Sequence, residues 1–175
     1  MRTVTWVGRN LWMAFLVLVA GLVSPTLARD LPGERESLAG LAGVYVSVEP
    51  MDPDVEREGL ARSTLQTDVE LKLRQAGIRV LTEAEVFVAP GFPHLYLRVG
   101  TVRGSEWPLY AFEILLELRQ RVMLARKPTI ALDAPTWRTS SVGSVGNKNL
   151  NRVREPVRDQ VDAFINAYLA ANPKQ

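Results

Sequence analysis

The chain has 175 residues, contains no cysteine and carries a formal net charge of +2. Residues 1–28 hold Arg2 and Arg9 and no acidic residue, so residues 29–175 have no net charge. A neutral remainder argues against nucleic-acid binding, which uses a basic patch or stripe. The lack of cysteine excludes disulfides and a lipid anchor attached to cysteine.

Residues 1–28 have the layout of a secretory signal. The two arginines precede an uncharged apolar run of about 13 residues, and a bilayer span needs roughly 20. Thr26 and Ala28 then supply small residues at a cleavage point. We therefore expect export to the periplasm or the cell exterior, with cleavage after Ala28. The alternative is an uncleaved segment that tethers the protein to a membrane.

The segment after the signal is polar, and one domain follows it. Residues 29–37 include Pro32 and Gly33, so we expect a flexible leader there. Residues 38–175 have the length of a single domain. Residues 44–48, a β-branched and aromatic run, are predicted to form a strand. Residues 50–62, which contain two prolines and a glycine, are predicted to form a surface loop.

The clearest helix signal covers residues 63–76. Ser63 and Gln66 have capping-box spacing, and Gly77 suits the position just after the helix. Leucine, valine and alanine side chains form one apolar stripe along this segment. Residues 78–81 are predicted to form a second strand. A strand–helix–strand unit of this kind favours parallel pairing.

Three further strands are expected before the last helix. Residues 95–99 and 110–124 alternate, and the longer run is mostly apolar at even positions and mostly charged at odd positions. That alternation indicates a strand with one buried face and one wetter face. Residues 129–139 are expected as another strand, bulged near Pro135. Residues 140–149, rich in serine, glycine and asparagine, are expected to form a loop.

Residues 150–170 carry a helical apolar stripe. Pro156 inside it indicates either a kink or a true start near Glu155. The complete order is β-α-β-β-β-β-α. It predicts an α+β two-layer sandwich, in which both amphipathic helices lie on one face of a mixed β-sheet.

This order of elements resembles the small domain shared by the CsgG curli-secretion protein, the LpoB activator of penicillin-binding proteins and the N-terminal domain of TolB. The segments that carry the resemblance are strand 44–48, the helix 63–76 with residues 77–81, strands 95–102 and 110–124, and the final helix. Residues 65–71 and the Thr136-Trp137 pair look closer to uncharacterised secreted bacterial proteins. The resemblance implies an envelope scaffold or activator that works through protein contacts. Without the lipidated cysteine of CsgG and LpoB or the propeller of TolB, pore formation and propeller contacts are not implied.

Residues suited to catalysis or metal binding are few. His94 is the only histidine, which excludes multi-histidine zinc sites, and a serine-based triad would depend on it. Its place between a proline and a strand indicates a turn histidine that caps a backbone group, with a hydrolase as the alternative. Asp52, Asp54, Glu56 and Glu58 could suit calcium, but Arg57 stands where an EF-hand needs glycine, so a solvated acidic loop is preferred.

Two other patterns also have simpler interpretations. The glycine-rich residues 143–148 precede a helix but do not match a P-loop, which favours a flexible connection over a phosphate cradle. Glu113 and Glu117 share a strand face about 13 Å apart, which is wider than a glycosidase pair. With Arg119 and Arg121 nearby, we expect a salt-bridged outer face.

The aromatic residues Trp107, Tyr110 and Trp137 could form an exposed interaction patch, although core packing or cover for a sheet edge is the preferred interpretation. We therefore predict a non-enzymatic envelope protein that needs no cofactor or metal and binds another protein. The predicted interaction surface is made of Trp107, Trp137, Glu113, Leu115, Glu117, Arg119 and Arg121. The alternative is a small-molecule-binding protein with an apolar cleft between the sheet and the helices.

Overall fold

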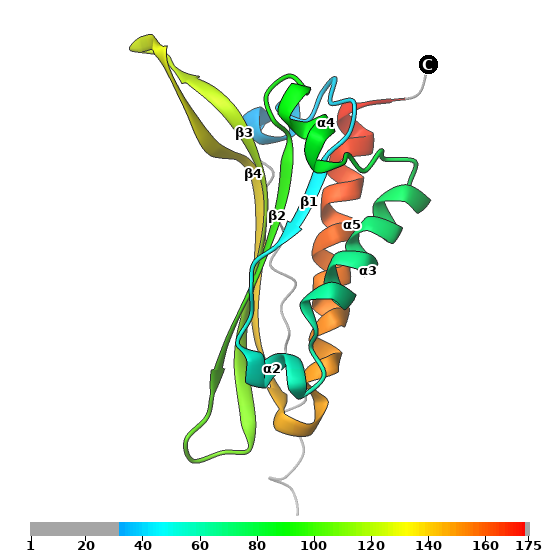
Figure 1. Cartoon of the computed structure of the whole chain (residues 1–175), viewed down its shortest axis with the longest axis vertical. Coiled ribbons are helices and arrows are strands. Elements are labelled where there is room, and N and C mark those ends of the chain that lie inside the picture. The colour runs from blue at the N-terminus through cyan, green and yellow to red at the C-terminus, as the bar shows by residue number, and fades with distance from the viewer. Residues whose placement is uncertain (1–31, 174–175) are drawn as a thin grey trace, which may run out of the picture.

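The computed structural model describes residues 32–173. Its strands pair in the order β1-β2-β3-β4, with β1 parallel to β2 and the other pairs antiparallel. The long helices α3 and α5 lie together on one side of this mixed sheet (Figure 1), so the predicted α+β fold is confirmed. The elements are α1 (Pro32–Glu36), β1 (Tyr45–Val48), α2 (Pro53–Arg57), α3 (Arg62–Gln75), α4 (Glu83–Val88), β2 (His94–Arg103), β3 (Leu109–Leu124), β4 (Lys127–Gly146), η1 (Asn147–Val153) and α5 (Arg154–Ala171).

The central strand β3 has the two faces that its sequence predicts. Ile114, Leu116 and Leu118 are fully buried against the helices, because successive side chains of a strand point to opposite faces. The alternate residues face away from α3 and α5. β2 and β4 follow β3 in register, so the whole sheet has one covered face and one open face.

The covering helices are held to the sheet and to each other. Leu65, Val69 and Leu73 of α3 are buried, as the predicted stripe requires. Trp137 of β4 packs edge-on against Phe164 of α5, with ring centroids 5.2 Å apart. The guanidinium of Arg154 on α5 donates two hydrogen bonds, of 2.8 and 2.9 Å, to the carboxylate of Asp68 on α3. Such bidentate pairs fix the geometry of the two helices as well as adding energy.

The strand assignments need two corrections. Residues 78–81 do not form a strand; Val80 makes only an isolated parallel bridge to Val44, and the chain then enters α4. Residues 140–146 are not a loop, because β4 continues through them to Gly146. Glycine suits this strand at Gly143, where an added Cβ would lie 2.6 Å from the Phe112 ring. The irregularity expected near Pro135 is confirmed as a register shift opposite Leu118 and Arg119.

The N-terminal part of the domain contains two helices that the sequence analysis assigned to a leader and a loop. Helix α1 lies within the expected leader, and it is held by Leu38, which is fully buried just after it. Ser37 also contributes, because its backbone oxygen accepts a hydrogen bond of 3.1 Å from Gln120 Nε2. Helix α2 lies within the expected acidic loop and is capped by the carboxylate of Asp52.

The capping box expected at the start of α3 is absent. The helix begins at Arg62, so Ser63 lies inside its first turn, and no side chain caps Ala61. Gln66 instead donates a hydrogen bond of 2.8 Å to the backbone oxygen of Val46 on β1. Near the C-terminus, α5 begins at Arg154, which confirms the true start that Pro156 indicated.

The predicted signal, with its uncleaved alternative, lies outside the described residues. Within residues 32–173, no helix combines the length and the apolar character needed to cross a membrane.

We expect Gly43→Ala to destabilise the fold. Gly43 is buried, and an added Cβ would lie 2.6 Å from the backbone oxygen of Arg79, which holds β1 through a hydrogen bond from Val44. Overpacking of this kind costs about 1–3 kcal/mol, measurable by urea unfolding. Gly33→Ala is the control, because nothing lies within 4 Å of the added atom. Equal midpoints for wild type and Gly43→Ala would contradict this account of the β1 junction.

Candidate functional site at the base of the β3–β4 arm

The open face of the sheet carries most of the predicted interaction residues. It contains the β3 side chains that alternate with the core, and the structure brings all five predicted β3 residues to this face: Glu113, Leu115, Glu117, Arg119 and Arg121. Sequence periodicity alone is therefore enough to place them together.

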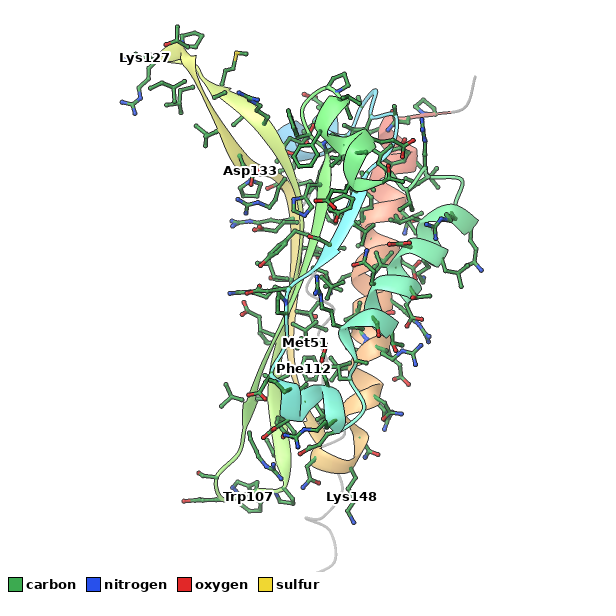
Figure 2. The ribbon with its side chains drawn as sticks, viewed as in Figure 1. Met51, Trp107, Phe112, Lys127, Asp133 and Lys148 are labelled. Atoms are coloured by element: carbon green, nitrogen blue, oxygen red, sulfur yellow. The ribbon has the colours of Figure 1, made fainter. Side chains whose placement is uncertain are left out.

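The three aromatic residues do not form an exposed patch, and core packing is confirmed for Tyr110 and Trp137. Trp137 and Tyr110 are 1% and 3% exposed, because both point to the covered face of the sheet and pack in the core. Trp107 is 70% exposed, in the hairpin between β2 and β3. Figure 2 shows Trp107 at the end of the molecule opposite Lys127. Trp107 and Trp137 therefore do not belong to one surface.

Ion pairs neutralise much of the open face. Arg98 pairs with Glu113 at 3.0 Å, and Arg119 pairs with Glu117 at 3.1 Å and with Asp133 at 2.7 Å. The predicted salt-bridged outer face is confirmed for Glu117 with Arg119. Glu113 pairs instead with Arg98 of β2, and Arg121 forms no ion pair with a described residue. Glu117 is only 7% exposed, and an unpaired buried charge would destabilise the fold. Its ion pair with Arg119 compensates for the burial of the carboxylate.

Beyond Arg119, β3 and β4 leave the sheet as a two-stranded arm. β2 begins at His94, opposite Arg119, so residues further along β3 have no β2 partner. We call residues 121–133 the arm. Figure 1 shows it projecting beyond the other strands and away from α3 and α5, and Figure 2 places Asp133 near its base. The arm is therefore a projection of the sheet with little cover from the rest of the domain.

A pocket of about 380 Å³ lies between the base of the arm and α4. We call it the corner pocket. Its volume is near the lower limit of small-molecule sites, which are mostly apolar with a few converging polar groups. Its walls combine aromatic and aliphatic side chains with four polar ones: Tyr45, Glu83, Val86, Phe87, Phe92, His94, Arg121 and Asp133.

Phe92 is held in the pocket in an unusual backbone conformation. Its φ is 50°, which is rare for a bulky residue and often marks a functional site. Gly91 beside it also has positive φ, and its oxygen accepts a hydrogen bond of 2.7 Å from the Arg121 amide. The Phe92 ring stands edge-on to Phe87, and the Arg121 guanidinium lies 5.6 Å from its centroid. The backbone thus presents an aromatic ring and a cation side by side.

His94 lies at the start of β2 on the open face. Its ring is flanked by Tyr45 and Tyr96, and its Nε2 lies within hydrogen-bonding distance of the Ser47 hydroxyl. The expectation of a backbone cap is therefore not met. Burial lowers the pKa of His94; Asp133 opposes this shift and Arg119 adds to it.

The Ser47–His94 pair is better suited to holding the pocket in place than to nucleophilic catalysis. A triad needs a third group that orients the histidine, and backbone donors aimed at the reacting carbonyl. In the described structure, the carboxylate of Asp133 accepts its hydrogen bond from Arg119 rather than from His94. Ser47 also lies within the β1–β2 ladder rather than on a turn with free amides.

A second hollow, of about 470 Å³, lies between β4 and the first turns of α5. It occupies part of the space between sheet and helices where the small-molecule alternative expected a cleft. Phe112, Val145 and Val153 give it an apolar floor, and Arg152, Glu155 and Asp159 line it as well. Phe112 is the one aromatic residue in its walls, whereas the corner pocket has three aromatic side chains besides His94. Because small-molecule sites are lined mainly by apolar and aromatic side chains, we regard the corner pocket as the better-formed site.

The acidic residues do not assemble a metal site. Residues 32–173 contain no group of three or more histidine, aspartate or glutamate side chains that could hold an ion. In the expected acidic loop, Asp54 pairs with Arg57 and Glu58 pairs with Arg103.

Helix α4, which forms one wall of the pocket, was not among the elements predicted from the sequence. A signal was present, because Thr82 and Glu85 have capping-box spacing and form that box in the structure. The positive φ of Phe92 had no comparable signal.

No protein-family model matches the chain, and a search of curated proteins finds no match.

The stability of the protein should fall as the pH drops from about 7 to about 5. The ordinary pKa of histidine, 6.5, is lowered for His94 in the folded state. Just below pH 6.5 the unfolded chain therefore binds this proton before the folded chain does, which favours unfolding. The hydrogen bond from the Thr82 backbone lowers the pKa of Glu85 from 4.5, so Glu85 affects stability only at a lower pH than His94 does.

This prediction is checked by urea unfolding at several pH values in wild type and His94→Gln. The variant should lose part of the pH dependence. Identical slopes in the two proteins would show that His94 does not titrate as its burial implies.

Proposed function

We propose that this protein is an exported, non-enzymatic protein of the cell envelope that acts by contacting another protein. The proposal that the protein is exported rests on residues 1–28, which resemble a secretory signal. If this segment is not cleaved, it would tether the protein to a membrane. The resemblance to envelope scaffold domains supports the same class of function.

The observation that carries the proposal is the exposed apolar surface of the arm. Met123, Ile130 and Leu132 are 71%, 41% and 38% exposed. On α4, which forms the other side of the corner pocket, Phe87 and Val88 are also exposed. Met123 lies on the same face of the arm as Arg121 and Asp133, whereas Leu132, which pairs with Val122, lies on the other face, so the arm exposes apolar side chains on both faces. Exposed apolar surface is a mark of interaction sites in soluble domains. These arm residues pack against little of the rest of the domain, so we attribute their apolar character to binding rather than to folding.

The proposed contact surface therefore differs from the one predicted from sequence. Arg121 and Arg119 remain at its edge, whereas Trp137 is in the core. The part of the open face around Glu113 and Glu117 carries ion pairs and offers a partner charged groups rather than apolar area. Arg126 and Lys127 at the exposed end of the arm add positive charge, which favours a partner with an acidic rim.

A photo-crosslinking residue at Met123 should capture one protein of defined mass in intact cells of the native host. The same residue at Leu71 is the control, because Leu71 is 51% exposed on α3 but lies away from the arm. A product at position 123 and none at position 71 supports the proposal. The same pattern at both positions, or no product at 123, contradicts it.

The triple change Met123→Ser, Ile130→Ser and Leu132→Ser should abolish the crosslinked product. Because position 123 is changed in this variant, the photo-crosslinking residue is placed at position 121. Because all three side chains are exposed, we expect the unfolding free energy to change by only about 0.5 kcal/mol per site. A large loss of stability would indicate that the arm residues serve the fold rather than a partner.

Small-molecule binding is the second candidate, and the corner pocket favours it. Native mass spectrometry of protein purified from its own host should then show an added mass. Phe87→Ala should reduce the bound fraction, because Phe87 lines the pocket, whereas Leu71→Ala should not. A wild-type protein that carries no added mass would argue against a tightly held ligand.

A further inference from the structure

We propose that the corner pocket binds an amphiphile whose apolar chain lies against Phe87 and Phe92 and whose anionic group is bound by Arg121. This inference rests on the second candidate function and names the class of ligand. It is independent of whether the arm binds a protein.

The walls of the pocket select an apolar group. Tyr45, Val86, Phe87 and Phe92 supply aromatic and aliphatic surface to a volume of about 380 Å³. The positive φ of Phe92 turns its ring into this space, where it meets Phe87 edge-on. Outside the pocket, Val88 of α4 and the apolar residues of the arm are exposed. Of the exposed apolar residues of the arm, Met123 lies on the same face as Arg121, so a ligand longer than the pocket would extend toward Met123.

Arg121 is the polar group of the pocket with the most binding capacity left. It lies over the Phe92 ring and makes no ion pair with any described residue. Its planar guanidinium offers several donors that match a carboxylate or a phosphate, and in this pocket they border apolar surface. Both anions fit this chemistry, so the head group is an anion held by paired hydrogen bonds.

The other polar groups are engaged or peripheral. The charge of Asp133 is bound by Arg119 at 2.7 Å, and that hydrogen bond raises the pKa of Arg119. His94 is hydrogen-bonded to Ser47, and its lowered pKa keeps the ring neutral near pH 7. Glu83 is exposed in the first turn of α4. Its charge opposes an anion, so Glu83→Gln should tighten binding.

The test is calorimetric titration of the full chain with four probes that share one alkyl chain, each used below its micelle concentration or, for the neutral alcohol, below its solubility limit. Dodecanoate and dodecyl phosphate carry the anion, dodecanol is neutral, and dodecyltrimethylammonium is cationic. We expect both anions to bind more tightly than dodecanol, and the cation to bind most weakly. The relative strength of carboxylate and phosphate then distinguishes a fatty-acid ligand from a phosphate head group.

Arg121→Gln should weaken both anions by about tenfold or more, as expected for loss of a charge-assisted contact, and leave dodecanol nearly unchanged. Arg126→Gln is the matched control, because Arg126 lies at the exposed turn of the arm and does not line the pocket. Circular dichroism of each variant confirms that it is folded.

Three results would overturn the inference. If all four probes bind equally, or Arg121→Gln leaves the anions unaffected, the pocket binds apolar chains without the proposed anion site, and small-molecule binding survives. If none of the probes binds, the amphiphile is excluded, while native mass spectrometry of host-purified protein still decides whether another ligand occupies the pocket.

Discussion

The burial of one face of β3 under α3 and α5 is the constraint on which the other features depend. Ile114, Leu116 and Leu118 are fully buried, and a slip of one residue would exchange them with the charged residues of the open face. Because β2 and β4 pair with β3 along their lengths, they adopt the same two-sided character. The sheet therefore keeps one face uncovered by the long helices, and this face is where binding groups can accumulate.

The arm and the corner pocket follow from a mismatch of lengths. β3 and β4 are longer than β2, and β2 stops at His94 opposite Arg119. Beyond Arg119, β3 and β4 pair only with each other among the described strands, so apolar residues on them remain exposed. Helix α4 and the Gly91–Phe92 turn fold beside the base of the arm, where the Arg121 amide holds the turn. The pocket thus forms where the sheet loses a strand. The open face supplies three of its four polar groups, and α4 supplies Glu83.

Sequence patterns predicted the elements whose signal is local and periodic. The alternation of β3, the stripe of α3 and the start of α5 near Pro156 are all read from neighbouring residues. The two-layer arrangement then follows, since each apolar face needs a cover. Of the predicted site residues, those on β3 were placed together because a period of two is enough to do so.

The failures have a common cause in contacts between distant segments. Gly143 and its serine neighbours suggested a loop, yet they form a strand in which glycine makes room for the Phe112 ring of β3. Trp137 suggested a surface, yet Phe164 of α5 buries it. The corner pocket depends on the φ of Phe92, which has no local sequence signal, and on the packing together of β1, α4 and the arm, which are distant in the sequence.

The arm is an uncovered projection of the sheet, whereas the middle of β3 belongs to the stable core. Hydrogen–deuterium exchange of the free protein measures this most directly, because amides exchange through openings whose free energy reflects local cover. Peptides covering residues 114–118 should exchange only through global unfolding, and peptides covering residues 122–131 should exchange far faster at every protein concentration. Equal protection of the two regions would contradict the account, because it would mean that the arm is covered in the free protein.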